Sequence, residues 1–337
     1  MSVKIVVIGA GIVGCLTAIK LKETGFDVTI VDKSQLGAES TWAGAGILFP
    51  LMPWQYEARV FDLCKNASTF YKAFSKKLFQ HTKIDPEYIE SGLICTPPFD
   101  KKNVLDWAGK NNLNVCEYKH KEESSYLFEF VGQIRAPRLM KSIKLYMKDL
   151  GINLLEETQL KHLKDININV KEWPTVGEDK ISGDIFVITS GAWSFELKKH
   201  YKEMIYPVRG QMIQYKKTKV TLKHILYSDD FYVLQRKDGI ILAGSTVENV
   251  GFDKTVSKFY LKKLMKKAEK LVPELNGLEP ETQWAGIRPG IKGNVPLIQK
   301  DKYHDNVFIN SGHFRYGLTM APQSAEEVCN MIIKSIQ

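Results

Sequence analysis

The pattern of apolar positions predicts short buried strands that alternate with amphipathic helices. Residues 3–8, "VKIVVI", form an apolar run rich in β-branched side chains, which is typical of a buried strand. A helical pattern follows at Ile12, Leu16 and Ile19, and Thr24-Gly25 ends it. Residues 27–32, "DVTIVD", predict the next strand. These segments together indicate a βαβ unit.

The same patterns continue along the chain. Apolar side chains at helical spacing predict helices around 63–78, 139–150 and 258–271. Buried strands are expected in "GDIFVITSGAW", residues 183–193, and from 207 in "PVRGQMIQYK". The runs "FYVLQR" and "IILAG" flank Asp238-Gly239, a pair typical of hairpin turns. A last helix is expected to begin near Pro322, since proline suits a first helical turn.

These elements predict two interleaved domains in a mixed α/β fold. The βα segments occupy 1–81, 137–205 and 290–337, and the hairpin-rich stretches 82–136 and 206–289 fall between them. We therefore expect a Rossmann-like domain and an antiparallel-sheet α+β domain. The length of 337 residues agrees, because single cores stop growing near ~250–300 residues.

Composition narrows the class of protein. The five cysteines are scattered, odd in number and never in a CxxC pair, which predicts a reduced, cytoplasmic protein without a metal site. We find no signal-peptide pattern and no apolar span of about 20 residues, so no membrane crossing is expected. Oligomeric state stays open, a homo-oligomer included.

The net charge of +9 is densest at 258–271, "KFYLKKLMKKAEKL". This segment favours an amphipathic helix with a solvated lysine face. The alternative is a surface for nucleic acid or anionic lipid, but aromatic side chains interleaved for base stacking are missing. No stable nucleic-acid or membrane partner is therefore expected.

A glycine motif follows the first strand. "GAGIVG" places Gly9, Gly11 and Gly14 between strand and helix, and Asp32 ends the second strand. In this context the motif predicts a dinucleotide whose pyrophosphate lies at the helix N-terminus, with Asp32 accepting from the ribose hydroxyls. The motif alone does not choose between NAD and FAD.

The loop that follows favours a flavin. Residues 37–50, "GAESTWAGAGILFP", are rich in small residues and carry hydroxyls at Ser40 and Thr41. Backbone with so few large side chains can lie flat against a large planar ligand.

Two arginines stand in glycine-rich apolar segments. Arg288 lies in "WAGIRPGI" and Arg315 in "SGHFRYGLTMAP". A buried guanidinium needs a negative partner, and a carboxylate matches its fork with two hydrogen bonds. The alternatives are an interdomain ion pair for Arg288 and, for Arg315, a segment whose glycines serve the cofactor. Paired carboxylates, GxSxG, HExxH and Cys/His motifs are missing, which favours hydride transfer by positioning.

Five stretches in order, "VVIGAGIVG", "STWAGAGILFP", "PVRGQ", "AGIRPG" and "SGHFRYGLTMAP", resemble the FAD-dependent D-amino acid oxidase superfamily. Within it the chain is most similar to the glycine oxidases associated with thiamine biosynthesis, from Val3 to about Glu327. The resemblance implies non-covalent FAD in the first domain and substrate in the second. The absence of cysteine between Trp284 and Pro322 argues against a cysteine-linked flavin.

The resemblance also implies residue roles. Arg288 would bind the substrate α-carboxylate, Tyr232 would hydrogen-bond the same group, and Arg315 would face the active site. Ile47 and Val247 stand near the substrate where methionines are expected. The implied cofactor-binding residues are Gly9, Gly11, Gly14, Asp32, Lys33, Ser40, Thr41, Ala45, Gly46, Leu160, Ser190, Gly191, Gly312, His313, Phe314, Tyr316, Gly317, Leu318 and Thr319.

The implied reaction is oxidative deamination of glycine or another small amino acid, such as sarcosine or a small D-amino acid. Hydride would pass from the α-carbon to flavin, the imine would hydrolyse to an oxo acid and ammonia, and O₂ would be reduced to peroxide. A quinone-linked D-amino acid dehydrogenase, a tRNA-modifying flavin oxidase acting on a wobble-uridine aminoacetic group, and a flavin-binding scaffold without turnover stay open as alternatives.

Overall fold

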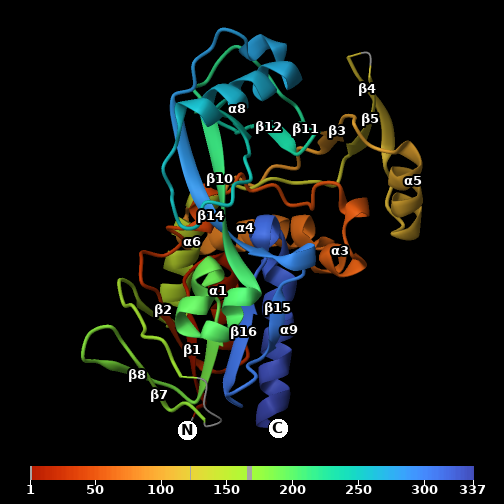
Figure 1. Cartoon of the computed structure of the whole chain (residues 1–337). Coiled ribbons are helices and arrows are strands. Elements are labelled where there is room, and N and C mark those ends of the chain that lie inside the picture. Colours follow the sequence, from red (N-terminus) through yellow and green to blue (C-terminus); the bar gives the residue numbers. More distant parts are fainter. Residues whose placement is uncertain (1, 122, 165–168) are drawn as a thin grey trace.

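The structure is a computed structural model that describes residues 2–121, 123–164 and 169–337. Two large sheets organise it, a six-stranded sheet in the lower half of Figure 1 and an eight-stranded sheet in the upper half. The N- and C-terminal ends lie close together at the lower end (Figure 1). The mixed α/β fold predicted from the sequence is confirmed, whereas the domain boundaries stay a prediction.

The six-stranded sheet has the order β15-β16-β9-β1-β2-β6. Its strands are β1 (Lys4–Ile8), β2 (Asp27–Val31), β6 (Asn153–Leu155), β9 (Ile185–Ile188), β15 (Leu297–Lys300) and β16 (Val307–Ser311). All neighbours pair in parallel except β15 and β16. Their nearly continuous apolar sequences fit a sheet that is covered on both faces.

Helices cover one face of this sheet and short segments cover the other. The covering helices are α1 (Ile12–Glu23), α4 (Ala67–Thr82), α6 (Ala136–Asp149) and α9 (Gly317–Ile336). The other face packs against Trp173, Leu197 and Tyr201. These come from β7 (Glu172–Pro174), which pairs with β8 (Lys180–Ser182), from α7 (Ser194–Leu197) and from η3 (Lys199–Glu203).

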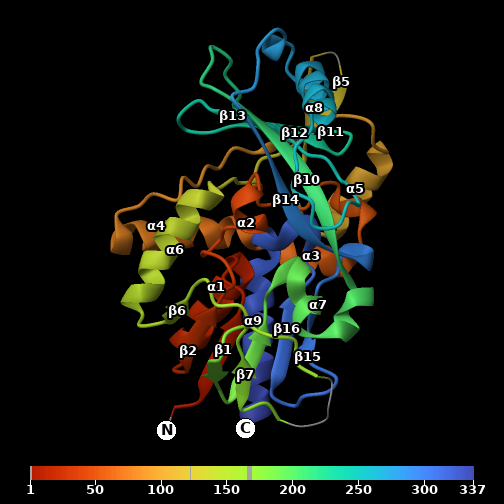
Figure 2. The same ribbon diagram turned by 60° about the vertical axis from the view of Figure 1, so that its left-hand side comes forward.

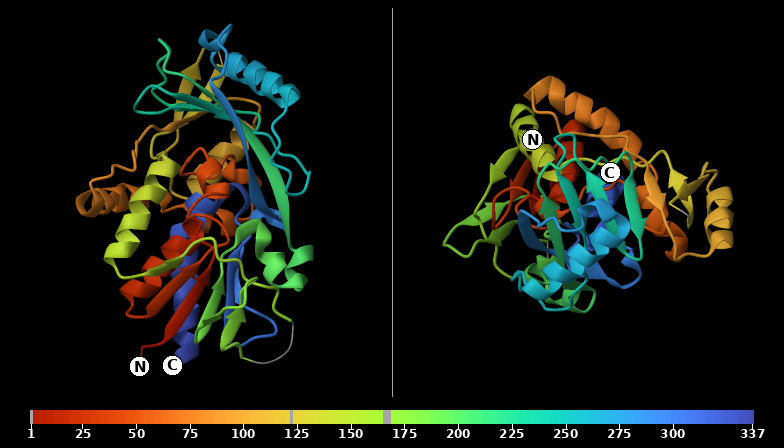
Figure 3. Two further views of the ribbon diagram at one scale, coloured as in Figure 1. Left: turned by 90° about the vertical axis from the view of Figure 1, so that its left-hand side faces the viewer. Right: turned by 90° about the horizontal axis from the view of Figure 1, so that it is seen from above.

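The eight-stranded sheet has the order β14-β10-β13-β12-β11-β3-β5-β4. Its strands are β3 (Leu93–Cys95), β4 (Cys116–His120), β5 (Glu123–Phe128), β10 (Ile205–Tyr215), β11 (Ile225–Ser228), β12 (Phe231–Gln235), β13 (Ile241–Gly244) and β14 (Thr282–Ile291). Helix α8 (Lys258–Leu271), predicted from its apolar spacing, buries Leu264 and Ala268 against one face. Figure 3 shows α8 across the upper end of the molecule and α9 running down towards the termini.

The long strands β10 and β14 link the two halves of the molecule. They pair along ten positions, from Ile205 opposite Ile291 to Gln214 opposite Thr282. Figure 2 shows them running side by side from the upper sheet down to the level of α7. Side chains on one face of this ribbon therefore point towards the carboxyl ends of the parallel strands.

Smaller elements complete the described chain. They are α2 (Ser40–Ala43), α3 (Ala58–Cys64), α5 (Lys101–Lys110), η1 (Pro53–Gln55), η2 (Gly191–Trp193), η4 (Pro273–Leu275), η5 (Lys292–Asn294) and η6 (Phe314–Tyr316). Helix α5 was not expected in the hairpin-rich stretch 82–136. It starts where the Asp100 carboxylate accepts the backbone N–H of Lys102 at 2.8 Å.

One predicted boundary is wrong. The last helix, α9, begins at Gly317, so Pro322 lies inside it. Proline cannot donate to the carbonyl of Leu318, four residues earlier. The buried hydroxyl of Tyr71 donates to that carbonyl instead, at 2.9 Å. This contact from α4 satisfies the carbonyl that the proline leaves without its helical donor.

Candidate active site

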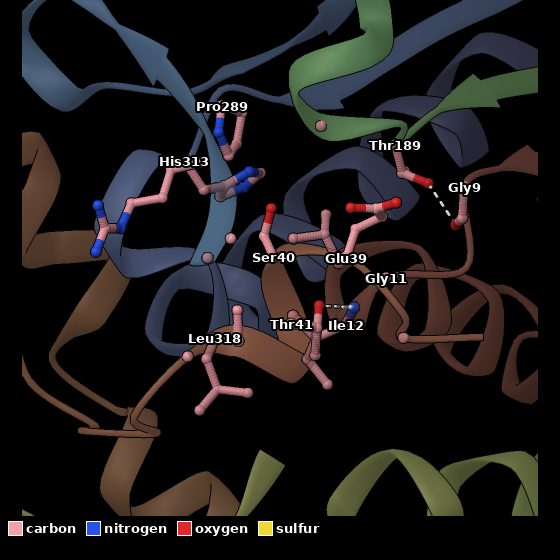
Figure 4. Close-up of a pocket in the computed structure, with 18 of the residues that line it drawn as sticks. Gly9, Gly11, Ile12, Glu39, Ser40, Thr41, Thr189, Pro289, His313 and Leu318 are labelled. Carbon is pink, nitrogen blue, oxygen red and sulfur yellow. Dashed lines mark hydrogen bonds between the residues drawn. The ribbon is translucent and has the colours of Figure 1, made fainter. Parts of the chain in front are cut away.

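A long cavity lies between the ends of the parallel strands and the β10–β14 ribbon. Its wall includes the ends of β1 and β2, the 37–51 loop, the turn after β9, and parts of β10, β12 and β14. In Figure 4, Gly9 and Gly11 lie on one side, Pro289, His313 and Leu318 on the other, and Ser40 and Thr41 between them. The carboxyl ends of parallel strands are the usual ligand site of such sheets.

The glycines of the first turn are required by close contacts. Gly9 has φ of +118°, and a Cβ there would lie 2.7 Å from the carbonyl oxygen of Thr189. A Cβ at Gly14 would lie 1.8 Å from the carbonyl oxygen of Gly9. Gly9 and Gly11 line the cavity, whereas Gly14 lies behind its wall. Gly14 therefore permits the close packing of α1 on the first turn rather than contact with a ligand.

Asp32 lines the cavity at the end of β2. One of its oxygens accepts the backbone N–H of Ala10 at 2.5 Å, and the other accepts that of Ser34 at 2.7 Å. Burial raises the pKa of Asp32, and these two amides act in the opposite direction. Each carboxylate oxygen keeps a second lone pair, so the residue can still accept hydroxyl groups of a ligand.

The neighbouring predicted residues Lys33, Leu160, Ser190 and Gly191 also line the cavity. The Lys33 Nζ lies 3.2 Å from a carboxylate oxygen of Glu196 and 4.5 Å from the centre of the Trp193 ring. The charge of Lys33 is therefore already partnered by the chain.

The loop 40–46 forms the floor between the two ends, and Ser40, Thr41, Ala45 and Gly46 all line the cavity. Thr41 Oγ1 accepts the backbone N–H of Ile12 at 3.1 Å, a contact drawn in Figure 4. The Ser40 hydroxyl donates to the carbonyl of Ile287 on β14. A Cβ at Gly46, where φ is +73°, would lie 1.9 Å from the carbonyl oxygen of Ile134. Only glycine fits there.

The C-terminal segment closes one side. The cavity is lined here by His313, Phe314, Tyr316, Gly317 and Leu318. The last two of these residues are the first two of α9. The positive end of that helix therefore faces the cavity. Burial lowers the pKa of His313 to about 3, and its Nε2 lies 3.1 Å from the Ser324 hydroxyl.

Two predicted residues of this segment lie behind the wall. Gly312, with φ of +93°, would place a Cβ 3.0 Å from Ile291 Cδ1. Thr319 is buried and its hydroxyl donates to the carbonyl of Ile47 at 3.2 Å. Neither belongs to the cavity lining.

Arg288 lines the cavity and has only neutral partners in the part of the chain that the structure describes. Its Nη1 donates to the carbonyl of Thr246 at 3.0 Å, and its Nη2 donates to the Ser245 hydroxyl at 2.8 Å. The interdomain ion pair considered from the sequence is therefore not formed. Burial lowers the pKa of Arg288 to about 10, so the group stays charged at neutral pH.

Tyr232 lies on the same side of the cavity and is buried. Its hydroxyl contacts Met212 Sδ at 2.9 Å, a weak acceptor that a ligand oxygen can replace. Burial raises the pKa of Tyr232, and the Arg288 charge acts against that rise. The hydroxyl thus stays protonated and can donate.

Arg315 also lines the cavity but is partly committed. Its Nη1 donates to Asp230 Oδ1 at 3.0 Å, whereas its buried Nε has no hydrogen-bond partner among the residues that the structure describes. Burial lowers the pKa of Arg315, but the Asp230 carboxylate outweighs burial and holds this pKa above its usual value. The two arginines of the sequence analysis therefore differ in how much charge they offer to a ligand.

Of the two residues predicted for the substrate pocket, one lines the cavity and the other does not. Ile47 lines the cavity beside Phe49 and Leu51. Val247 does not line it, and its side chain is 48% exposed. Its neighbours Thr246 and Glu248 point inward, so alternation along the extended chain turns Val247 towards solvent.

Sequence reasoning missed several residues of the wall. Gly210, Met212 and Ser245 line the cavity next to Arg288. Arg236 lies behind the loop and donates to the carbonyl of Ala45 at 2.8 Å. The fragment "PVRGQ" was the only signal for Gly210, and it did not show that this glycine would face an arginine.

No group of three or more His, Cys, Asp or Glu side chains in the described ranges could hold a metal ion. Among the helices described, none has the length and apolarity needed to span a bilayer.

Comparisons with known proteins agree with this geometry. The family model of DAO, described as FAD dependent oxidoreductase, matches residues 4–331. The chain belongs to this family of FAD-dependent oxidoreductases. A glycine oxidase of Pseudomonas aeruginosa is 34% identical, and the alignment covers 98% of this chain and 95% of the relative. A glycine oxidase of Pseudomonas putida is 33% identical over 97% of this chain and 93% of its own.

A solved structure shows the same fold. The crystal structure of glycine oxidase from Bacillus cereus superposes with a TM-score of 0.89 at 24% sequence identity, covering 99% of this chain and 95% of that one. The DAO family uses FAD, and the cavity has the features that such a group needs. Gly9 and Gly46 place backbone in the cavity wall, and Asp32 keeps free lone pairs at the end of β2.

Proposed function

We propose that this enzyme oxidises glycine or another small amino acid, such as sarcosine or a small D-amino acid, with non-covalent FAD and O₂. The observation that carries the proposal is Arg288, a cavity-lining guanidinium that no carboxylate of the described chain neutralises. A desolvated cation of this kind selects a planar anion, and an α-carboxylate can accept both N–H groups of its fork. The glycine oxidases named above support the substrate class.

The chain's own residues orient the substrate. Arg288 pins the carboxylate, and Tyr232 turns its hydroxyl from the Met212 sulfur to donate to the same group. The apolar side chains of Ile47, Phe49 and Leu51 line the cavity and exclude water from the α-carbon. Fixed orientation is the main aid that the protein gives, because holding the reacting atoms in place lowers the entropic part of the barrier.

Other residues would hold the cofactor. Gly9 and Gly11 would receive its pyrophosphate, Asp32 its ribose, and Ala45 and Gly46 one side of its ring system. Bound FAD would supply the acceptor for the hydride of the α-carbon and the route by which its electrons reach O₂ to give hydrogen peroxide. The imine product then hydrolyses to an oxo acid and ammonia. All five cysteines are described and none lines the cavity, which supports non-covalent binding.

Anaerobic mixing of the purified yellow protein with glycine, sarcosine and small D- and L-amino acids tests the proposal. We expect bleaching of the flavin by at least one small amino acid, and stoichiometric peroxide when air is admitted. Bleaching without peroxide, followed by reoxidation with a soluble quinone, would identify a dehydrogenase. Failure of every amino acid to bleach the flavin would refute the proposal.

A further inference from the structure

The Arg288 guanidinium lies directly over Gly210. A Cβ built at Gly210 would meet Nη1 and Nη2 of Arg288 at 2.1 Å and Cζ at 2.2 Å. Gly210 is not among the glycines with positive φ, so its backbone does not demand glycine. Glycine inside a strand weakens the strand and commonly marks a close approach. Here the group that approaches is the guanidinium.

The two faces of β10 separate two arginines. Val208, Gly210 and Met212 alternate with Arg209 and Gln211, and only Gly210 and Met212 of these five line the cavity. Val208 is opposite Arg288 in the β10–β14 register, and Arg209 is opposite Ile287. Because opposite residues share a face, Arg288 is on the cavity face and Arg209 on the far face.

The far face holds a buried ion pair. Arg209 donates from Nε at 3.0 Å and from Nη2 at 2.6 Å to Glu248 Oε2. Both side chains are buried, and Gln211 Nε2 donates to Glu248 Oε1 at 2.9 Å. Arg209 Nη1 also donates to Asp253 at 2.6 Å. The charge of Glu248 is therefore fully engaged on that side.

The segment 245–248 connects the two faces. Its Thr246 carbonyl and Ser245 hydroxyl accept from Arg288, while the Thr246 hydroxyl donates to Glu248 Oε1. The backbones of Arg209 and Glu248 exchange two hydrogen bonds, at 2.9 and 3.0 Å. Glu248 is close enough for its charge to act on Arg288, although it contacts Arg209 instead. Without Arg209, the unpaired charge of this carboxylate would act on Arg288 through the 245–248 segment that both side chains contact.

We propose that Gly210 and Arg209 are positioning residues for carboxylate recognition. Gly210 leaves the space in which the Arg288 guanidinium lies. Arg209 holds Glu248 on the far face, so that Arg288 meets neutral acceptors and keeps its charge for the substrate. This inference rests on the proposed function, in which Arg288 binds the substrate carboxylate.

Binding of glycolate, a small carboxylate without an amine, tests the steric part. The FAD-loaded enzyme is titrated with glycolate while the flavin absorbance is followed. Gly210→Ala is expected to raise the Kd by about tenfold to a hundredfold, the equivalent of one lost charge-assisted hydrogen bond. It is expected to change KM more than kcat. Gly109→Ala is the matched control, because Gly109 is exposed on α5 and a Cβ there meets nothing within 4 Å.

A double variant keeps this test decisive if Gly210→Ala folds poorly. If the added methyl acts only on Arg288, it should have no further effect once Arg288 is replaced. The double variant Gly210→Ala, Arg288→Met should then have the same melting temperature and the same Kd for glycolate as Arg288→Met alone. Additive losses in the double variant would overturn the steric part. So would a Gly210→Ala enzyme whose Kd for glycolate stays within about twofold of the wild type.

The electrostatic part has its own variants. Arg209→Met frees Glu248 and is expected to weaken glycolate binding by about tenfold or more. Adding Glu248→Gln removes the unpaired charge and should recover most of that loss, and Arg209→Lys should recover part of it. If the double variant binds as weakly as Arg209→Met, the Glu248 charge is not the cause and this part is wrong.

Arg288→Met distinguishes a failure of the proposed function from a failure of the positioning roles. If that variant binds glycolate as well as the wild type does, the proposed function fails. If it loses glycolate binding while Gly210→Ala and Arg209→Met keep it, the function stands and the positioning roles fail.

Discussion

The two ends of the cavity are built in opposite ways. At the glycine turn the chain satisfies its own polar groups: Asp32 accepts two backbone amides, and Thr41 accepts the Ile12 amide. At the other end, the Arg288 guanidinium donates only to neutral acceptors among the described residues, and the Tyr232 hydroxyl contacts the Met212 sulfur. The first end is a shaped backbone surface, whereas the second is a set of side chains with unused charge and hydrogen-bonding capacity.

This difference separates two kinds of effect. Changes at the glycine turn should alter packing and cofactor content together, because the same backbone packs against the chain and forms the cavity wall. Changes at Arg288 should alter substrate recognition and leave cofactor content unchanged, because neutral acceptors can be exchanged for water at little cost. Variants at both ends of the cavity test that separation.

Gly14→Ala should have the largest effect. Its Cβ would lie 1.8 Å from the Gly9 carbonyl oxygen, in backbone that cannot move without distorting the first turn. We expect a loss of about 3 kcal/mol in the free energy of unfolding, at the upper end for overpacking, with reduced FAD per chain. Urea unfolding and the flavin-to-protein absorbance ratio measure the two quantities. Gly109→Ala is the control, and equal behaviour of the two variants would contradict the prediction.

The two arginines of the substrate end should respond unequally to lysine. Arg288→Lys keeps the charge and loses the fork, so we expect kcat/KM to fall about a hundredfold with FAD content unchanged. Arg315→Lys should cost about tenfold or less, because Asp230 already engages this guanidinium. Steady-state kinetics with whichever amino acid bleaches the flavin measure both. The reverse order would mean that Arg315 binds the carboxylate.

His313 should make stability depend on pH at the cavity wall. Its folded pKa of about 3 lies below the unfolded value of about 6.5, since burial disfavours the charged ring. The unfolded chain therefore binds the proton first as pH falls, and stability is lost progressively below about pH 6.5. Between about pH 7 and pH 5 the wild type should lose about 2 kcal/mol more than His313→Gln does. Urea unfolding at both pH values measures this, and equal losses would contradict it.

The motif of the glycine-turn end was accessible from local sequence because its residues lie within one βαβ unit at the start of the chain. Gly9, Gly14 and Asp32 follow from a short motif, and the fold class follows from the alternation of strands and helices around it. Arg288 was visible as a charge in an apolar segment, but its proposed role in binding the substrate carboxylate came from family resemblance.

The rest depends on contacts between distant segments, which no local pattern encodes. Gly210 is explained only by an arginine on the neighbouring strand. Val247 was expected near the substrate from the family resemblance, yet chain alternation turns it outward. Arg236 supports the loop at Ala45 from a hairpin far along the chain.

The smallest predicted effect concerns Pro322, where a local rule failed for a similar reason. Tyr71→Phe removes the donor that replaces the missing proline N–H at the Leu318 carbonyl, and should cost about 1 kcal/mol in the free energy of unfolding, the lower end for an unpaired buried group. In a Pro322→Ala background the same change should cost less, because the restored amide can donate to that carbonyl. Urea unfolding of the four proteins gives this coupling. Additive losses would show that the Tyr71 hydroxyl does not replace the missing proline N–H and that Tyr71 contributes by packing alone.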